Sequence, residues 1–158
     1  MLKISRNNLD AFYKAIADKM PLYLPLVKGG EVNFGYYTDG AKVDIDTLKT
    51  VKSPKDVFFP QSENLYTCGN DAGKLSVTPE KHRDTPFVVF GMKACDVRAV
   101  AVLDKVFLSA PVDTFYAARR EMGTVVSLAC GRPERSCFCA AFGIDCAAPE
   151  GDVAAWLT

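Results

Sequence analysis

Two short segments without charged residues set the fold of this chain. Residues 87–92 read FVVFGM and residues 124–129 read TVVSLA, and each is a continuous apolar run of strand length. Strands that are apolar on both faces are typical of parallel sheets covered by helices. Between them, residues 97–108 and 113–122 have the apolar spacing of helices, the second capped by Asp113. This pattern predicts an α/β (α+β overall) fold with a small, mostly parallel sheet.

The amino-terminal segment predicts a further helix. Apolar residues recur at helical spacing from Leu9 to Met20, and Pro21 ends the pattern. Ser5 or Asn7 can cap this helix. We expect its apolar stripe to pack into the core.

Residues 22–45 have a different pattern, in which short apolar and aromatic runs are separated by turn sequences at 28–30 and 39–40. They predict a small β-rich meander. Residues 46–63 contain two prolines and several lysines, so we expect an irregular, solvated segment with a short helical turn after Gln61.

The length of 158 residues, of which 49% are hydrophobic, suits one domain with its own core. We expect a single domain over residues 1–158, with the helix and meander in residues 1–50 and the α/β core in residues 51–158. The meander is the part that can pack as a separate lobe.

Charge and hydropathy exclude several classes of partner. The chain has 19 basic and 19 acidic side chains, which gives no electrostatic reason to bind nucleic acid or an anionic membrane. The charged amino terminus is unlike a secretory signal, and no apolar run is long enough to span a bilayer. We therefore expect a cytoplasmic protein, in which the six cysteines are free thiols or metal ligands rather than disulfides.

Four cysteines follow the two predicted buried strands. Cys95 comes just after the first strand and Cys130 just after the second, and Cys137 and Cys139 lie in the loop beyond it. The carboxyl ends of parallel strands meet at one edge of a sheet, where ligands bind. The spacing C-x34-C-x6-C-x-C therefore predicts four thiols around one point.

Two metal centres suit four thiolates, namely an iron–sulfur cluster and a tetrathiolate zinc ion. Zinc ribbons usually offer C-x2-C pairs, and bacterial ferredoxins a C-x2-C-x2-C run, and neither occurs here. A disulfide between Cys137 and Cys139 would close a strained ring. We interpret Cys68 and Cys146 as small buried hydrophobes, because neither has a cysteine neighbour at ligand spacing.

Basic residues surround the predicted ligands. Lys93, Arg98, Arg132 and Arg135 lie within a few residues of them, and cations stabilise the negative charge of a thiolate-bound cluster. The alternative is that these side chains only keep the loops solvated. We expect Asp96 to cap the following helix.

The remaining residues give little sign of catalysis. His82, the only histidine, lies in a charged loop, and we expect it to be exposed. No Ser-His-Asp set, Cys-His set or phosphate-binding glycine motif is present. The aromatic side chains expected in the core are Phe58, Phe59, Phe107, Phe115 and Tyr116.

Four sequence blocks resemble one protein family in their order and spacing. They are SPKDVFFPQSENLY (53–66), FGMKACDVRAVAVLDKVFL (90–108), DTFYAARRE (113–121) and CGRPERSCFCAAFG (130–143). The family comprises iron–sulfur electron-transfer subunits, such as the beta subunit of cytoplasmic sulfhydrogenases and its counterpart in anaerobic sulfite reductase. The resemblance covers about residues 50 to 145 and is to the family's amino-terminal region.

The resemblance implies an electron-transfer domain with a [4Fe–4S] cluster. Its hallmark blocks map onto Lys93, Cys95, Asp96, Cys130, Cys137 and Cys139. Arg98 and Arg132 would lie beside the cluster, which air readily removes. The implied partners are flavin-containing and catalytic subunits of a redox complex.

Full-length family members continue into a ferredoxin-like portion with further clusters, so the resemblance implies part of a longer subunit, without turnover of its own. The alternative hypothesis is a non-catalytic docking module whose thiols hold a structural zinc ion or no metal.

Overall fold

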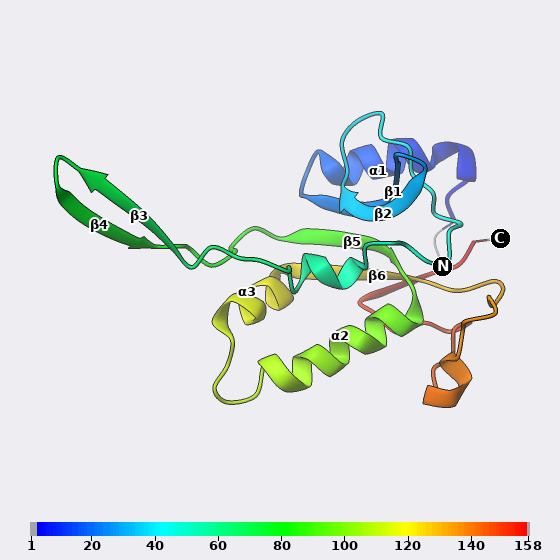
Figure 1. Cartoon of the computed structure of the whole chain (residues 1–158). Coiled ribbons are helices and arrows are strands. Elements are labelled where there is room, and N and C mark those ends of the chain that lie inside the picture. Colours follow the sequence, from blue (N-terminus) through cyan, green and yellow to red (C-terminus); the bar gives the residue numbers. More distant parts are fainter. Residues whose placement is uncertain (1–2, 158) are drawn as a thin grey trace.

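A computed structural model describes residues 3–157 of the chain as a sheet with helices on both faces, and a projecting hairpin (Figure 1). The helices and strands follow in chain order. They are η1 (Arg6–Asn8), α1 (Leu9–Ala17), β1 (Leu22–Lys28), β2 (Glu31–Tyr36), η2 (Pro54–Val57), β3 (Tyr66–Asp71), β4 (Lys74–Pro79), β5 (Phe87–Met92), α2 (Ala94–Phe107), α3 (Thr114–Met122), β6 (Gly123–Leu128), η3 (Cys139–Phe142) and β7 (Val153–Ala155).

The main sheet has five strands in the order β2-β1-β5-β6-β7. The neighbours β1, β5, β6 and β7 run parallel, and β2 is an antiparallel edge strand. Helix α1 covers one face and helices α2 and α3 cover the other, which gives three layers (Figure 1). The predicted mostly parallel α/β fold is confirmed.

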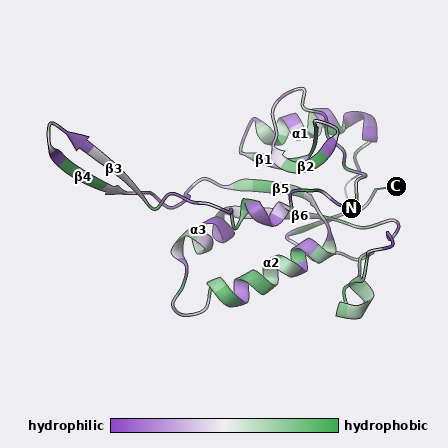
Figure 2. Cartoon of the chain, in the orientation of Figure 1, coloured by the Kyte–Doolittle hydropathy of each residue, from purple (hydrophilic) through white to green (hydrophobic). Residues whose placement is uncertain are grey.

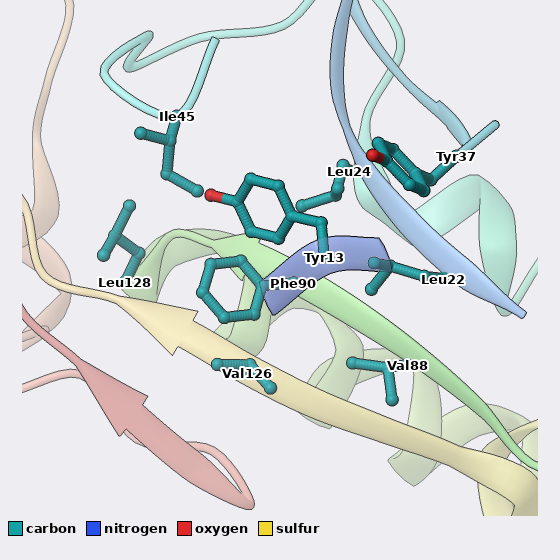
Figure 3. Close-up of a cluster of buried hydrophobic side chains, with 9 residues drawn as sticks. All are labelled: Tyr13, Leu22, Leu24, Tyr37, Ile45, Val88, Phe90, Val126 and Leu128. Atoms are coloured by element: carbon teal, nitrogen blue, oxygen red, sulfur yellow. The ribbon is translucent and has the colours of Figure 1, made fainter. Parts of the chain in front are cut away.

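The central strands β5 and β6 separate two cores. Every residue of β5 is buried, and its side chains alternate between the two faces. On the α1 face, Tyr13 packs edge-on against Phe90, with ring centroids 5.5 Å apart (Figure 3). On the other face, Phe87 packs against Phe58 at 5.6 Å. Burial on both faces explains why β5 is a continuous apolar run in the sequence (Figure 2).

A bulge lies near the end of β5, just before the first of the four cysteines. Phe90 pairs with Val126 and Met92 with Ser127, which leaves Gly91 as an extra residue without a partner in β6. Gly91 has a φ of +96°, a conformation that side chains disfavour. Bulges bend a strand and redirect the side chains that follow. The bulge at Gly91 therefore changes the direction of the chain where it enters the turn between β5 and α2.

The amino-terminal elements follow the predicted pattern, with two corrections. Helix α1 packs its apolar stripe on the sheet, as expected. Neither predicted cap makes a side-chain cap bond: Ser5 precedes η1 and Asn8, not Asn7, precedes α1. The meander forms β1 and β2, but β1 pairs with β5 in the main sheet, so it is not a separate lobe.

Several elements lie where the sequence did not predict them. The helical turn in residues 46–63 is η2, ahead of the expected position after Gln61, because Ser53 caps it and Pro54 occupies its first turn. The hairpin β3–β4 and the short strand β7 were not predicted. Among residues 3–157, no helix is long and apolar enough to cross a membrane.

The second half of the chain agrees closely with the prediction. Helix α3 begins after Asp113, whose carboxylate accepts the N–H of Tyr116 at 2.9 Å. The predicted core rings Phe58 and Tyr116 are fully buried, whereas the prediction for Phe59 is wrong, because its ring is exposed and stacks on Phe107 with centroids 4.4 Å apart. His82 is exposed, as predicted. Its ring centroid lies 4.5 Å from that of Phe115, which was predicted in the core but is only half-buried.

Candidate functional site

The fold brings the ends of β5 and β6 to the same edge of the sheet. Cys95 is the second residue of α2, directly after β5, and Cys130 lies two residues beyond β6. The two strands pair in parallel, so both cysteines lie at their common carboxyl edge. The segment that contains Cys137 and Cys139, drawn in orange, lies near the amino end of α2 (Figure 1). All four cysteines are free thiols.

The thiol of Cys95 responds to the charges of its neighbours. Partial burial raises its pKa to about 11, although the residue as a whole is exposed. The carboxylate of Asp96 and the thiols of Cys139 and Cys130 shift this pKa in the same direction. Such mutual effects require these thiols to be close to one another.

Cys130 occupies the middle of the thiol group. Burial raises its pKa, the ammonium of Lys93 opposes this shift, and the thiols of Cys146, Cys139 and Cys137 reinforce it. Its backbone N–H donates to the carbonyl of Cys146 at 2.8 Å. The hydrogen bond to Cys146 therefore holds the backbone of Cys130, and three later cysteines influence its thiol.

The loop after Cys130 presents the other two predicted ligands. Cys137 is exposed, and its Sγ accepts the backbone N–H of Glu134 at 3.3 Å. Cys139 is half-buried and opens η3. Lys49 ties this loop to the segment after β2 through Ser136 and through Glu134, the latter at 3.8 Å. The lysine-rich segment is thus not only a solvated loop.

The thiols gather without forming a closed ligand set. Within residues 3–157, no three or more Cys, His, Asp or Glu side chains stand in positions that would hold a metal ion. The donor chemistry suits a thiolate-bound metal, because Cys95 and Cys130 lie at one edge of the sheet and a backbone N–H group is directed at the sulfur of Cys137. Residues 131–138, which contain Cys137, form no helix or strand.

Lys93 is the most buried charged side chain described, with 7% of its surface exposed. Burial lowers its pKa, whereas Cys130, Asp46, Asp96 and Cys95 act in the opposite direction. No hydrogen bond or ion pair of its ammonium is present within the described part of the chain. A buried cation therefore lies among the thiols.

Asp96 does not have the predicted capping role. Lys93 is the residue that precedes α2, and the Asp96 carboxylate instead accepts hydrogen bonds from Ser53 at 3.2 Å and Lys55 at 3.0 Å. It thereby joins the start of η2 to the start of α2. Arg98 and Arg132 are exposed. Their exposure agrees with both interpretations of these residues, namely solvation of the loops and positive charge beside a metal site.

The two remaining cysteines differ from the sequence interpretation. Cys68 is exposed on β3, so its assignment as a buried hydrophobe is wrong. Cys146 is half-buried, but it contacts Cys130 through the backbone and influences its thiol. Sequence reasoning therefore overlooked a fifth thiol at this edge. Its position seven residues after Cys139 was the available signal.

Comparison with known proteins gives one clear relative. Over 152 residues, 96% of its length, the chain is 28% identical to sulfhydrogenase 2 subunit beta of Pyrococcus furiosus. This similarity supports a relation to the family that the four sequence blocks resemble. The chain spans 44% of the length of that relative. No protein-family profile matches the chain. No solved structure matches it either.

Proposed function

We propose that this domain binds an iron–sulfur cluster and relays electrons within a larger oxidoreductase complex. The observation that carries the proposal is the position of Cys95 and Cys130 at the common carboxyl edge of the parallel strands β5 and β6, with Cys137 and Cys139 in the segment that follows. The name of the related protein, a sulfhydrogenase subunit, supports a redox role. The resemblance of the four sequence blocks to iron–sulfur electron-transfer subunits leads us to propose a [4Fe–4S] cluster as the bound group.

Each proposed ligand has a different structural support. Cys95 and Cys130 would form the fixed half of the site, because α2 and the hydrogen bond to Cys146 hold their backbones. Cys137 and Cys139 would form the movable half, because their loop is exposed. When bound, such a cluster accepts and releases single electrons.

The surrounding side chains would adjust the charge of the site. Lys93, Arg98 and Arg132 supply positive charge near four thiolates, which favours the more negative, reduced state. The N–H of Glu134 that points at Cys137 acts in the same direction. Asp96 would act indirectly, since its bonds to Ser53 and Lys55 hold η2 against the start of α2.

We further propose that the domain acts with other subunits in the cytoplasm, including flavin-containing and catalytic ones. The word subunit in the name of the relative supports an assembly. A reducing compartment suits six free thiols. Residues 1–158 would then serve as a single domain of a longer iron–sulfur subunit, with no independent turnover.

Anaerobic reconstitution with iron and sulfide tests the proposal. We expect about four irons per chain and a paramagnetic signal on reduction. Cys137→Ser should lose most of the iron, whereas Cys68→Ser, on the hairpin outside the set, should keep it. Protein without bound iron, or equal iron in both variants, would overturn the proposal.

The alternative function is a non-catalytic docking module that binds other subunits through its surface. The same thiols would then hold one zinc ion or none. Elemental analysis of protein purified without oxygen separates the two functions.

A further inference from the structure

A cleft of about 650 Å³ lies at the carboxyl edge of the sheet. One wall comes from the residues after β5, β6 and β7, including Lys93 and Leu157. Arg6, ahead of α1, and Ile45, Asp46 and Leu48, after β2, also line the cleft. Its volume falls within the range of small-molecule sites, and the carboxyl edge of a parallel sheet is where ligands bind.

The cleft carries an excess of positive charge. Arg6 and Asp46 neutralise each other through a double hydrogen bond of 2.8 and 3.0 Å. Lys93 and Arg132 remain, and neither has a hydrogen bond or ion pair with any side chain in the described range. The Arg6 hydrogen bond lowers the pKa of Asp46, and the charges of Lys93 and Arg132, which line the same cleft, lower it further.

The rest of the cleft is apolar. Ile45, Leu48 and Leu157 line it together with Trp156. The Trp156 side chain is 52% exposed, and its indole N–H donates to the carbonyl of Ala147 at 2.8 Å. This bond orients the ring and satisfies its only donor, so the rest of the ring is free for apolar contact.

We propose that this cleft binds a small organic anion, namely a carboxylate with a flat apolar body. Lys93 and Arg132 would hold the carboxylate, and Trp156 and Leu48 would contact the body. The side chain of Lys93 lines the cleft without a hydrogen-bond or ion-pair partner among residues 3–157, and a bound carboxylate would supply one. Asp46, which also lines the cleft, disfavours a dianion such as phosphate.

This site adjoins the proposed cluster site and shares Lys93, Cys130 and Arg132 with it, but its other residues differ. Of the four proposed cluster ligands, only Cys130 borders the cleft. Its cations and its apolar wall are present without iron. The two proposals can therefore fail independently, and the binding experiment is run on metal-free protein and on protein treated with iron and sulfide.

Trp156 provides a specific reporter, because it is the only tryptophan of the chain. The full chain is titrated with benzoate, with neutral benzamide and with inorganic phosphate, and its tryptophan fluorescence is recorded. Saturation-transfer NMR on the two aromatic probes detects binding that leaves the fluorescence unchanged. We expect saturable binding of benzoate, at least tenfold weaker binding of benzamide, and no displacement of benzoate by equimolar phosphate.

Variants test the two cations. Arg132→Gln changes an exposed side chain and should weaken benzoate binding at least tenfold. Lys93→Met should weaken it by a similar factor, and circular dichroism first establishes that this variant is folded. Lys105→Met removes a matching charge from the exposed last turn of α2 and should leave binding unchanged. Equal binding of benzoate and benzamide, full binding by Arg132→Gln, or no binding by either method would overturn the proposal. Benzoate binding by protein that takes up no iron would refute only the cluster proposal.

Discussion

The strand pairs β5–β6 and β3–β4 are both built from six-residue strands, but they differ in how far their side chains are buried. In β5 all six residues are buried and in β6 five are, whereas in β4 all six are exposed and in β3 only one is half-buried. Figure 1 shows β5 and β6 between helices and the hairpin β3–β4 projecting as an arm. Strand pairing alone therefore does not determine how much a strand contributes to the core.

The sequences of the two pairs reflect this difference. In the arm, the pairs Cys68–Val77 and Asn70–Leu75 share one face, while polar pairs such as Thr67–Thr78 share the other. The arm thus alternates, whereas β5 and β6 contain no charged residue and are apolar on both faces apart from Thr124 and Ser127 of β6. A lone two-stranded hairpin is marginally stable in water. The comparison predicts that the central pair carries the stability of the domain and the arm carries almost none.

The largest effect is expected at Phe87. Its fully buried ring contacts Phe58 and Tyr23, and the guanidinium of Arg83 lies 4.1 Å from its centroid. Phe87→Ala should lower the free energy of unfolding by about 3–5 kcal/mol through lost burial and a cavity. Val77→Ala on the arm is the control, with an expected change below about 0.5 kcal/mol. Urea unfolding measures both, and similar losses would break the comparison.

A smaller effect is expected from a single added methyl group. A Cβ on Gly123 would lie 2.5 Å from Cε1 of Phe58 and 2.7 Å from Cζ of Phe87, and neither buried ring has room to move. Gly123→Ala should therefore cost about 2 kcal/mol by overpacking. On the arm, a Cβ on Gly69 meets only the hydroxyl of exposed Ser76, which can rotate away. If Gly69→Ala costs as much as Gly123→Ala, the arm is as tightly packed as the core.

The buried region should also show a pH effect. Burial raises the pKa of Tyr13 from about 10 to about 12, and its hydroxyl, which points toward Ile45, has no hydrogen-bond partner in the described residues (Figure 3). The unfolded chain loses this proton first, so the stabilising contribution is complete below about pH 10 and is lost as pH rises through about 12. By pH 11 the loss should be about 1.4 kcal/mol.

Tyr13→Phe isolates this contribution. At pH 8 the variant should be as stable as the wild type or slightly more stable, because it removes an unpaired buried hydroxyl. Between pH 8 and 11 it should lose about 1.4 kcal/mol less than the wild type in urea unfolding. Equal losses in the two proteins would show that Tyr13 does not titrate as a buried group.

The same contrast explains what the sequence predicted. Continuous apolar runs can be satisfied only inside a layered structure, so β5, β6 and the parallel sheet were predictable. The arm alternates over short strands around an Asp71-Ala72-Gly73 turn, in a region where no core contact adds to the signal. Strand β7 is three residues long and depends on pairing with β6, a tertiary contact that local patterns do not encode.

The candidate site was predictable to a similar degree. Topology was enough to place Cys95 and Cys130 at one edge, because they follow neighbouring parallel strands. The hydrogen bonds from Ser53 and Lys55 to Asp96 join segments about forty residues apart, and no local sequence pattern predicts them. The cleft beside Lys93 likewise needs the packing of segments from both ends of the chain.

The smallest effect is expected at the most exposed apolar side chain of the arm. Leu75 is 71% exposed, so Leu75→Lys removes almost no buried surface and should change the free energy of unfolding by less than about 0.5 kcal/mol. Amides of β3 and β4 should also exchange with solvent much faster than those of β5 and β6, because local opening of the arm breaks no core contact. Hydrogen-exchange mass spectrometry and urea unfolding measure the two quantities. A loss above about 1.5 kcal/mol, with slow exchange in the arm, would show that its apolar face is packed in solution, and the distinction between the two strand pairs would no longer hold.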